Sequence, residues 1–166
     1  MSYRYRNDLT AELVRDLLDY DLLSGVFTWK QDRSACVHAG DRAGSISYGY
    51  IIIRINGTNY KAHRLAFLWV NGEWPREEVD HVNRVKDDNR WANLREATRS
   101  ENTVNSPPRE KLSDLPLGVR ITPSGKFRAL IAGMHLGIFA TPEEAAEVYA
   151  TAAKDFYGDF YRGPPI

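Results

Sequence analysis

An aspartate and a histidine stand side by side at Asp80 and His81, and asparagines follow at Asn93 and Asn102. Hydrolysis of a phosphodiester needs a base that activates water, a cation that neutralises the developing charge, and stabilisation of the departing 3′ oxygen. Asp80 is a hard oxygen ligand suited to Mg²⁺, and Asn102 offers an amide oxygen to the same ion. With a single ion a base is also required. Neutral His81 is the candidate, because the ordinary pKa of histidine is about 6.5.

Asn93 and Asn89, in the same stretch, receive different roles. Asn93 lies at the start of the second of two predicted strands, where its amide can bond backbone groups across the loop and hold the strand that carries His81. Asn89 lies within the loop and is interpreted as a turn former. The spacing therefore predicts two metal ligands, one base and one supporting amide.

The elements that must position these residues are short. "EEVDHV" and "NLREA" predict two strands joined by the polar loop "NRVKDDNRWA". Thr98 and Glu101 then form a capping box at the start of a helix, which Pro107 and Pro108 end. The predicted arrangement is strand, loop, strand and helix.

The preceding residues predict a helix, a hairpin and a second helix. Thr10 caps a helix with a buried stripe of Leu13, Val14, Leu17 and Leu18. "GYIIIRINGTNYK" alternates as a strand and meets Asn-Gly, the pair that favours a two-residue hairpin turn. "HRLAFLWVNGEWP" predicts a helix ending near Gly72, in which His63, Trp69 and Trp74 pack or cap.

The stretch from residue 62 to 105 resembles HNH endonucleases of the phage and homing type, which are ββα-metal nucleases. The first motif position falls on His81, the middle asparagine on Asn93, and the third position, often histidine, on Asn102. The resemblance implies a divalent ion, Mg²⁺ or alternatively Mn²⁺. The asparagine at the third position favours such oxygen-loving metals, so zinc is not expected.

The C-terminal sequence predicts a three-stranded sheet packed on one helix. Turns are expected at Pro123-Ser124-Gly125 and at Gly133-Met134. A capping box from Thr141 to Glu144, with proline at the first helical position, begins the helix. The predicted buried stripe of this helix consists of Ala145, Ala146, Tyr149, Ala152, Ala153 and Phe156.

This module resembles the plant ethylene-responsive-factor type of DNA-binding domain from residue 117 to about 162. Such domains lay their sheet in the major groove, which is wide enough for a β-ribbon. Strand alternation places Lys126 and Arg128 on one face, and Arg120, Thr122 and His135 fall on the exposed face by the resemblance. Leu130 and Ala132 stand where the family often has Glu and Arg, so the base preference of the family does not carry over.

Charge is unevenly distributed along a chain of 166 residues whose formal net charge is zero. Residues 81–132 hold a net charge of +4, as expected for a localised phosphate-binding strip. Within it, five cations are close enough in sequence to contact phosphates around the site: Arg84, Lys86, Arg90, Arg95 and Arg99. Arg84, Lys86 and Arg99 are the candidate contacts, and one or two of the five are expected to pair with Asp87, Asp88 or Glu96.

Other features of the sequence restrict the class of protein. Cys36 is the only cysteine, which excludes an internal disulfide and a cysteine-clustered zinc site. No apolar run is long enough to span a bilayer, and no signal peptide is recognisable, so a cytoplasmic protein is expected, in the host cell if phage-encoded.

The combined prediction is an α+β protein with three parts: a nuclease domain at 1–108 with its ββα core at about 76–106, a linker at 109–116, and a DNA-binding domain at 117–166. It is expected to cut double-stranded DNA as a nicking or homing-type enzyme and to be a monomer or weak dimer. One site per chain predicts a nick unless two chains assemble. The alternative is a non-catalytic, sequence-specific DNA-binding regulator that uses the C-terminal sheet. A structural protein with a relic motif is the third hypothesis.

Overall fold

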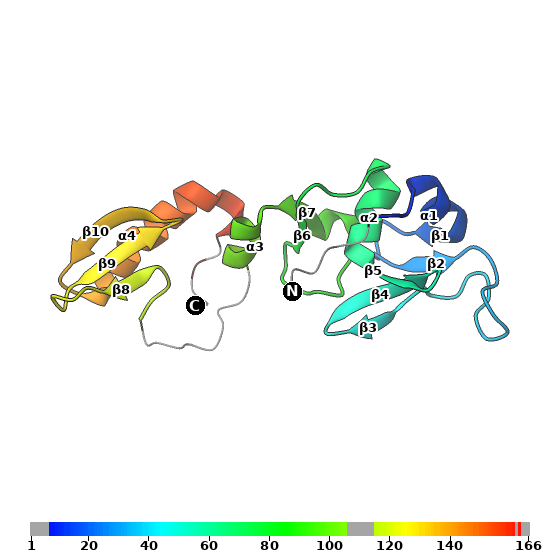
Figure 1. Ribbon diagram of the computed structural model, residues 1–166, viewed down its shortest axis with the longest axis horizontal. Helices are drawn as coiled ribbons and strands as arrows, with labels where there is room; N and C mark the ends of the chain where they lie inside the picture. Colours follow the sequence, from blue (N-terminus) through cyan, green and yellow to red (C-terminus); the bar gives the residue numbers. More distant parts are fainter. Residues whose placement is uncertain (1–6, 106–114, 162, 164–166) are drawn as a thin grey trace. The chain divides into compact units, whose positions relative to one another are not determined.

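The computed structural model describes residues 7–105, 115–161 and 163, and its fold is α+β, as predicted (Figure 1). Its packing divides the chain into two compact units, residues 1–98 and residues 99–166. Of the predicted linker at 109–116, only Leu115 and Pro116 lie within the described residues.

The first unit begins with a capped helix. The hydroxyl of Thr10 accepts a hydrogen bond from the backbone N–H of Leu13 at 3.3 Å, as predicted from the cap. Val14 and Leu18 are buried as predicted, whereas Leu13 is exposed, contrary to the predicted stripe, and Ala11 is buried in addition. The helix ends at Leu17 and the chain becomes extended, so only one short face meets the core. The elements here are α1 (Ala11–Leu17), β1 (Leu18–Tyr20) and β2 (Phe27–Trp29), with β1 and β2 antiparallel.

The predicted hairpin is present. Its strands are β4 (Tyr50–Ile55) and β5 (Thr58–Lys61), and β3 (Ser45–Ser47) pairs with the other edge of β4. The turn at Asn56 and Gly57 has φ values of 49° and 79°, the left-handed conformation that this pair adopts readily.

Helix α2 (Ala62–Asn71) follows β5 and packs beside this sheet (Figure 1). It ends at Gly72, whose φ of 82° makes it a left-handed C-cap, as predicted. The next elements are β6 (Glu78–His81), the 3₁₀ turn η1 (Trp91–Asn93), β7 (Leu94–Ala97) and α3 (Arg99–Asn105). Strands β6 and β7 are antiparallel, so the predicted order of strand, loop, strand and helix is confirmed.

Helix α3 packs with the second unit, whereas the sequence-derived scheme places it in the N-terminal domain. Its Val104 packs against the C-terminal core. The hydroxyl oxygens of Ser100 and Tyr157 are 3.3 Å apart.

The rest of the second unit is a three-stranded antiparallel sheet packed on one helix, as predicted (Figure 1). The elements are β8 (Val119–Ile121), β9 (Phe127–Ile131), β10 (Met134–Phe139), α4 (Pro142–Tyr157) and η2 (Gly158–Phe160). The capping box of Thr141 and Glu144 is present, with both reciprocal hydrogen bonds. A Cβ at Gly118 would lie 2.1 Å from the ring of Tyr149, so only glycine allows this helix to pack so closely.

Two details of the C-terminal prediction are wrong. The turn between β9 and β10 is Ala132-Gly133, not Gly133-Met134, because Met134 pairs with Ile131 in the sheet. Phe156 is 54% exposed, and its neighbour Tyr157 is buried in its place. The helix turns by about 100° per residue, so a one-residue shift in phase moves the last aromatic of the stripe to solvent.

Candidate active site and nucleic-acid-binding face

Asp80 and His81 lie at the end of β6 and are both buried, with 5% of each residue exposed. Asp80 lies opposite Arg95 in the antiparallel register of β6 and β7. The Nε and Nη2 atoms of Arg95 are each 2.9 Å from Oδ2 of Asp80. Cross-strand pairing thus orients the carboxylate, with one of its oxygens held by the guanidinium.

The imidazole of His81 is held by Asn89, whose Oδ1 lies 3.2 Å from Nε2 of His81. An amide oxygen only accepts, so this contact requires the proton on Nε2 and leaves Nδ1 as the acceptor nitrogen. The amide of Asn89 is oriented by donation from its Nδ2 to the carbonyl of Asp87 at 3.4 Å. The Tyr20 hydroxyl donates to the Asn89 carbonyl at 2.6 Å. Asn89, interpreted from sequence as a turn former, is therefore a buried partner of the candidate base.

Burial lowers the pKa of His81 below its ordinary value. The hydrogen bond that His81 donates to Asn89 and the charges of Asp80 and Asp88 raise this pKa, but the effect of burial prevails. At neutral pH the imidazole is thus uncharged, which is the form that takes a proton from water.

Asn93 ties the loop between β6 and β7 together. Its Oδ1 accepts from the backbone N–H of Asn83 at 3.0 Å, and its Nδ2 donates to Oδ1 of Asn83 at 3.0 Å and to the carbonyl of Asp88 at 2.7 Å. The backbone N–H of Val82 donates to the Asn93 carbonyl at 2.9 Å. The loop that carries Asn89 is therefore fixed at both ends next to His81.

Two aromatic neighbours of His81 were not identified as site residues from sequence. The rings of His63 and His81 lie 5.0 Å apart at 89°, and Tyr50 lies 5.3 Å from His63 and 6.1 Å from His81. Burial, followed by the neighbouring His81, lowers the pKa of His63 well below its ordinary value. His63 does pack, as predicted, but against the candidate base. Only the fold brings these three residues together.

The basic residues predicted to surround this site differ in their contacts. Arg90 pairs with Asp88 at 2.7 Å, a partner expected from the sequence, whereas Arg95 pairs with Asp80, which is not among the expected partners. Arg84 has a left-handed backbone with φ of 66°, a conformation that costs a non-glycine residue about 1 kcal/mol. Lys86 is exposed in the loop after β6, and Arg99 is exposed at the start of α3.

A metal ion would rely on few protein ligands. Among the residues that the structure describes, no three His, Cys, Asp or Glu side chains gather into a cluster that would hold a metal. The predicted donors are both oxygens, one carboxylate and one amide, and this chemistry fits Mg²⁺ or Mn²⁺ bound largely by water and phosphate. Asn102 lies on α3 in the second unit.

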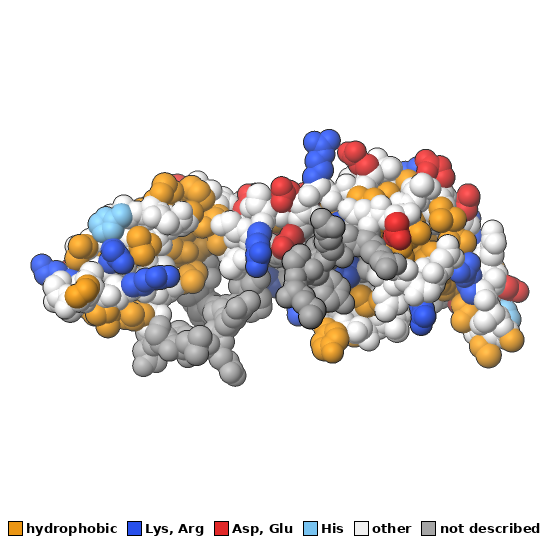
Figure 2. Space-filling view, viewed as in Figure 1, with side chains coloured by type: hydrophobic (Ala, Val, Ile, Leu, Met, Phe, Trp, Pro, Cys, Tyr) orange, Lys and Arg blue, Asp and Glu red, His pale blue; other side chains and the backbone are white. Residues whose placement is uncertain are grey.

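The outer face of the C-terminal sheet brings several of the predicted DNA contacts together. Arg120 and Arg128 are directly opposite each other on β8 and β9, and Ile138 lies opposite Arg128 on β10. His135 is exposed and opposite Leu130. Figure 2 shows basic and histidine side chains beside exposed apolar ones over these strands.

Two other predicted contacts, Thr122 and Lys126, lie in the turn between β8 and β9. The Thr122 hydroxyl lies 3.0 Å from the Ser124 hydroxyl, and it accepts from the backbone N–H of Lys126 at 3.1 Å. Thr122 thus shapes the turn, and Lys126 is exposed.

Comparison with known proteins supports a nuclease. Residues 60–104 match the family model described as HNH endonuclease. No curated protein and no solved structure matches the chain. Within the described parts of the chain, no helix has the length and apolarity needed to cross a membrane.

Proposed function

We propose that the protein is a metal-dependent endonuclease that hydrolyses phosphodiester bonds in double-stranded DNA. The observation that carries the proposal is the buried, neutral imidazole of His81, oriented by Asn89 and adjacent to Asp80. The match of residues 60–104 to HNH endonucleases supports the same chemistry.

His81 is the proposed general base. Its Nδ1 takes the proton of a water molecule whose oxygen attacks phosphorus, and the bond from phosphorus to the 3′ oxygen breaks. Asn89 keeps the proton on Nε2, so that Nδ1 carries the lone pair. Asn93 holds the loop that carries Asn89.

Asp80 and Asn102 are the proposed ligands of one divalent ion, Mg²⁺ or alternatively Mn²⁺. When bound, such an ion neutralises the charge that develops on the phosphate and on the departing oxygen. Arg95 orients the Asp80 carboxylate through Oδ2.

The outer face of the C-terminal sheet is the proposed DNA-positioning surface. Like charges directly opposite each other on neighbouring strands destabilise a sheet, and Arg120 and Arg128 are such a pair. A phosphate backbone would relieve their repulsion, and it would also contact exposed Lys126 and His135. In this scheme residues 1–108 form the domain that cleaves DNA, residues 109–116 are the linker, and residues 117–166 form the domain that binds DNA. Arg84, Lys86 and Arg99 add phosphate contacts near the site.

A plasmid assay tests the proposal. Supercoiled plasmid is incubated with the purified chain and Mg²⁺ or Mn²⁺, then with a chelator. We expect nicked circles from a monomer or weak dimer, because each chain has one active site, unless two chains assemble on the DNA. With chelator we expect no product. His81→Ala should abolish cutting and leave DNA retention in a gel unchanged.

The opposite outcome is equally informative. If folded protein gives neither relaxed nor linear DNA with any divalent metal, the endonuclease proposal fails. DNA retention without cleavage by the unmodified chain would instead support a non-catalytic regulator that uses the C-terminal sheet.

A further inference from the structure

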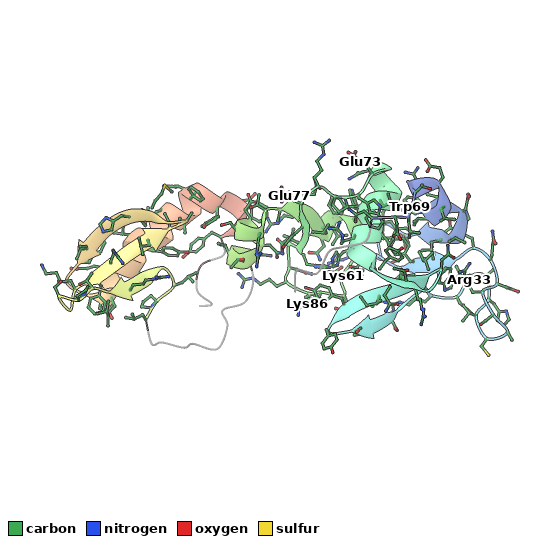
Figure 3. The ribbon with its side chains drawn as sticks, in the orientation of Figure 1. Arg33, Lys61, Trp69, Glu73, Glu77 and Lys86 are labelled. Carbon is green, nitrogen blue, oxygen red and sulfur yellow. The ribbon has the colours of Figure 1, made fainter. Side chains whose placement is uncertain are left out.

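Two lysines from different segments converge on the ring of Tyr50. The Nζ of Lys61 lies 4.2 Å from the ring centroid, and the Nζ of Lys86 lies 5.1 Å from it. Lys61 ends β5, and Lys86 lies in the loop after β6. Figure 3 labels both and shows them close together below α2. We call Tyr50, Lys61 and Lys86 the tyrosine–lysine cluster.

The fold holds this cluster in place. Lys61 is opposite Ile52 in the β4–β5 register, so it shares a face of the sheet with Tyr50, two residues before Ile52. A Cβ at Gly49 would lie 3.3 Å from Cδ of Lys86, so the glycine gives room for the lysine stem. Both ammonium groups are thus positioned by packing of their stems and by the face of the aromatic ring.

The cluster concentrates positive charge at a partly buried position. Burial, followed by the neighbouring charge of Arg64, lowers the pKa of Lys61; Lys86 acts in the same direction and Glu78 in the opposite one. Keeping two ammonium groups on one ring costs repulsion, which an anion placed between them would remove.

The cluster lies next to the candidate base. The ring of Tyr50 is 6.1 Å from the ring of His81, so the ring that carries both lysines is a neighbour of the candidate base. In a nuclease, the anion expected near the base is the DNA backbone.

We propose that Lys61 and Lys86, mounted on Tyr50, bind the phosphodiester oxygens of DNA at the point of cleavage. The inference rests on the proposed endonuclease function and adds Lys61 and Tyr50 to its substrate-binding residues. Lys61 is the half-buried contact that would hold the phosphate, and Lys86 is the exposed one.

Equilibrium binding without cleavage tests this assignment. A fluorescent DNA duplex is titrated with the full chain in EDTA at several salt concentrations. Each lost phosphate contact should reduce the slope of log K against log salt by about 0.9. We expect this reduction for Lys61→Met and for Lys86→Met, and none for Lys61→Arg, which keeps the charge.

Three further variants separate phosphate binding from a structural role. Lys30→Met removes an exposed cation from the same unit and should leave the slope unchanged. Tyr50→Phe retains the ring face and should behave as the parent chain, whereas Tyr50→Leu should reduce the slope. Circular dichroism and tryptophan fluorescence confirm that each variant is folded.

The outcome does not depend on catalysis. If Lys61→Met and Lys86→Met lower the melting temperature but keep the parental salt slope, the lysines only support the fold and the proposal is overturned. Absence of DNA binding by the parent chain overturns it as well. A parent chain that binds but does not cut would defeat the endonuclease proposal, while the salt slopes would still decide whether the cluster contacts phosphate.

Discussion

The two units of this protein bury different kinds of side chain. In the described part of the first unit the buried polar residues are His63, Arg64, Asp80, His81, Asn89 and Asn93. In the described part of the second unit, Asn105 on α3 is the one buried polar residue, and the core between sheet and α4 is apolar. The cross-strand arginines of the second unit, Arg120 and Arg128, lie on the outer face of its sheet.

This difference reflects two physical tasks. A base and a metal ligand need fixed orientations, and burial within a hydrogen-bond network provides them at a cost in desolvation. A surface that tracks a phosphate backbone needs exposed charge and adapts to its partner. The first unit therefore has the features of a site for chemistry, and the second those of a binding face.

The largest effect, on the rate of DNA nicking, is expected from removing the Asn89 side chain from the buried hydrogen-bond network. Asn89→Ala should lower the nicking rate about 100-fold, because the His81 ring loses the partner that fixes its orientation. Nicking by Asn89→Ala and Asn89→Asp is measured at pH 8, and the aspartate, which keeps an acceptor near Nε2, should retain more activity.

Exposed Asn71→Ala, at the end of α2, is the matched control and should cut as the parent chain does. Unchanged cutting by folded Asn89→Ala would show that the buried network does not position the base.

An intermediate effect, on DNA binding, is expected from removing the arginines on the outer face of the C-terminal sheet. The double variant Arg120→Ala and Arg128→Ala should weaken DNA binding about tenfold and lower the salt slope by about 1.8, since two phosphate contacts are lost. Fluorescence anisotropy at several salt concentrations measures both quantities.

The same double variant sharpens the comparison between the units. Its thermal stability should be unchanged or higher, because a like-charge pair is removed. A large loss of stability with unchanged DNA affinity would instead assign the two arginines to the fold.

The smallest effect is expected from the acid sensitivity of the first unit. The folded-state pKa of His63 lies well below the unfolded value of about 6.5, so the unfolded chain binds the extra proton first. As pH falls below about 6.5, the free energy of unfolding should therefore decrease, by up to about 1.4 kcal/mol per pH unit for each buried histidine.

Urea titrations at pH 7.5, 6.5 and 5.5 measure this dependence. All four tryptophans belong to residues 1–98, so their fluorescence reports the first unit alone. His63→Phe keeps a ring of similar shape and should show a shallower pH dependence than the parent chain. If the free energy of unfolding depends on pH identically in His63→Phe and in the parent chain, His63 does not gain a proton on unfolding.

Much of the local structure follows from the sequence by short-range rules. The Asn56-Gly57 turn, the left-handed cap at Gly72 and the Thr141–Glu144 capping box each depend on residues within one turn of each other. The turn at Ala132-Gly133 was misplaced by one residue, because alanine is not a usual residue for a positive φ and only strand pairing fixes its position.

The candidate site was only partly predictable for the same reason. The order and spacing of Asp80, His81, Asn93 and Asn102 are properties of the chain, and they indicated a nuclease before any fold was known. The hydrogen bond from His81 to Asn89, the packing of His63 and the convergence of Lys61 on Tyr50 join residues that are not neighbours in the sequence. Such contacts are set by how strands, loop and helix pack, so the sequence by itself determined the reactive groups and the tertiary structure decided their neighbours.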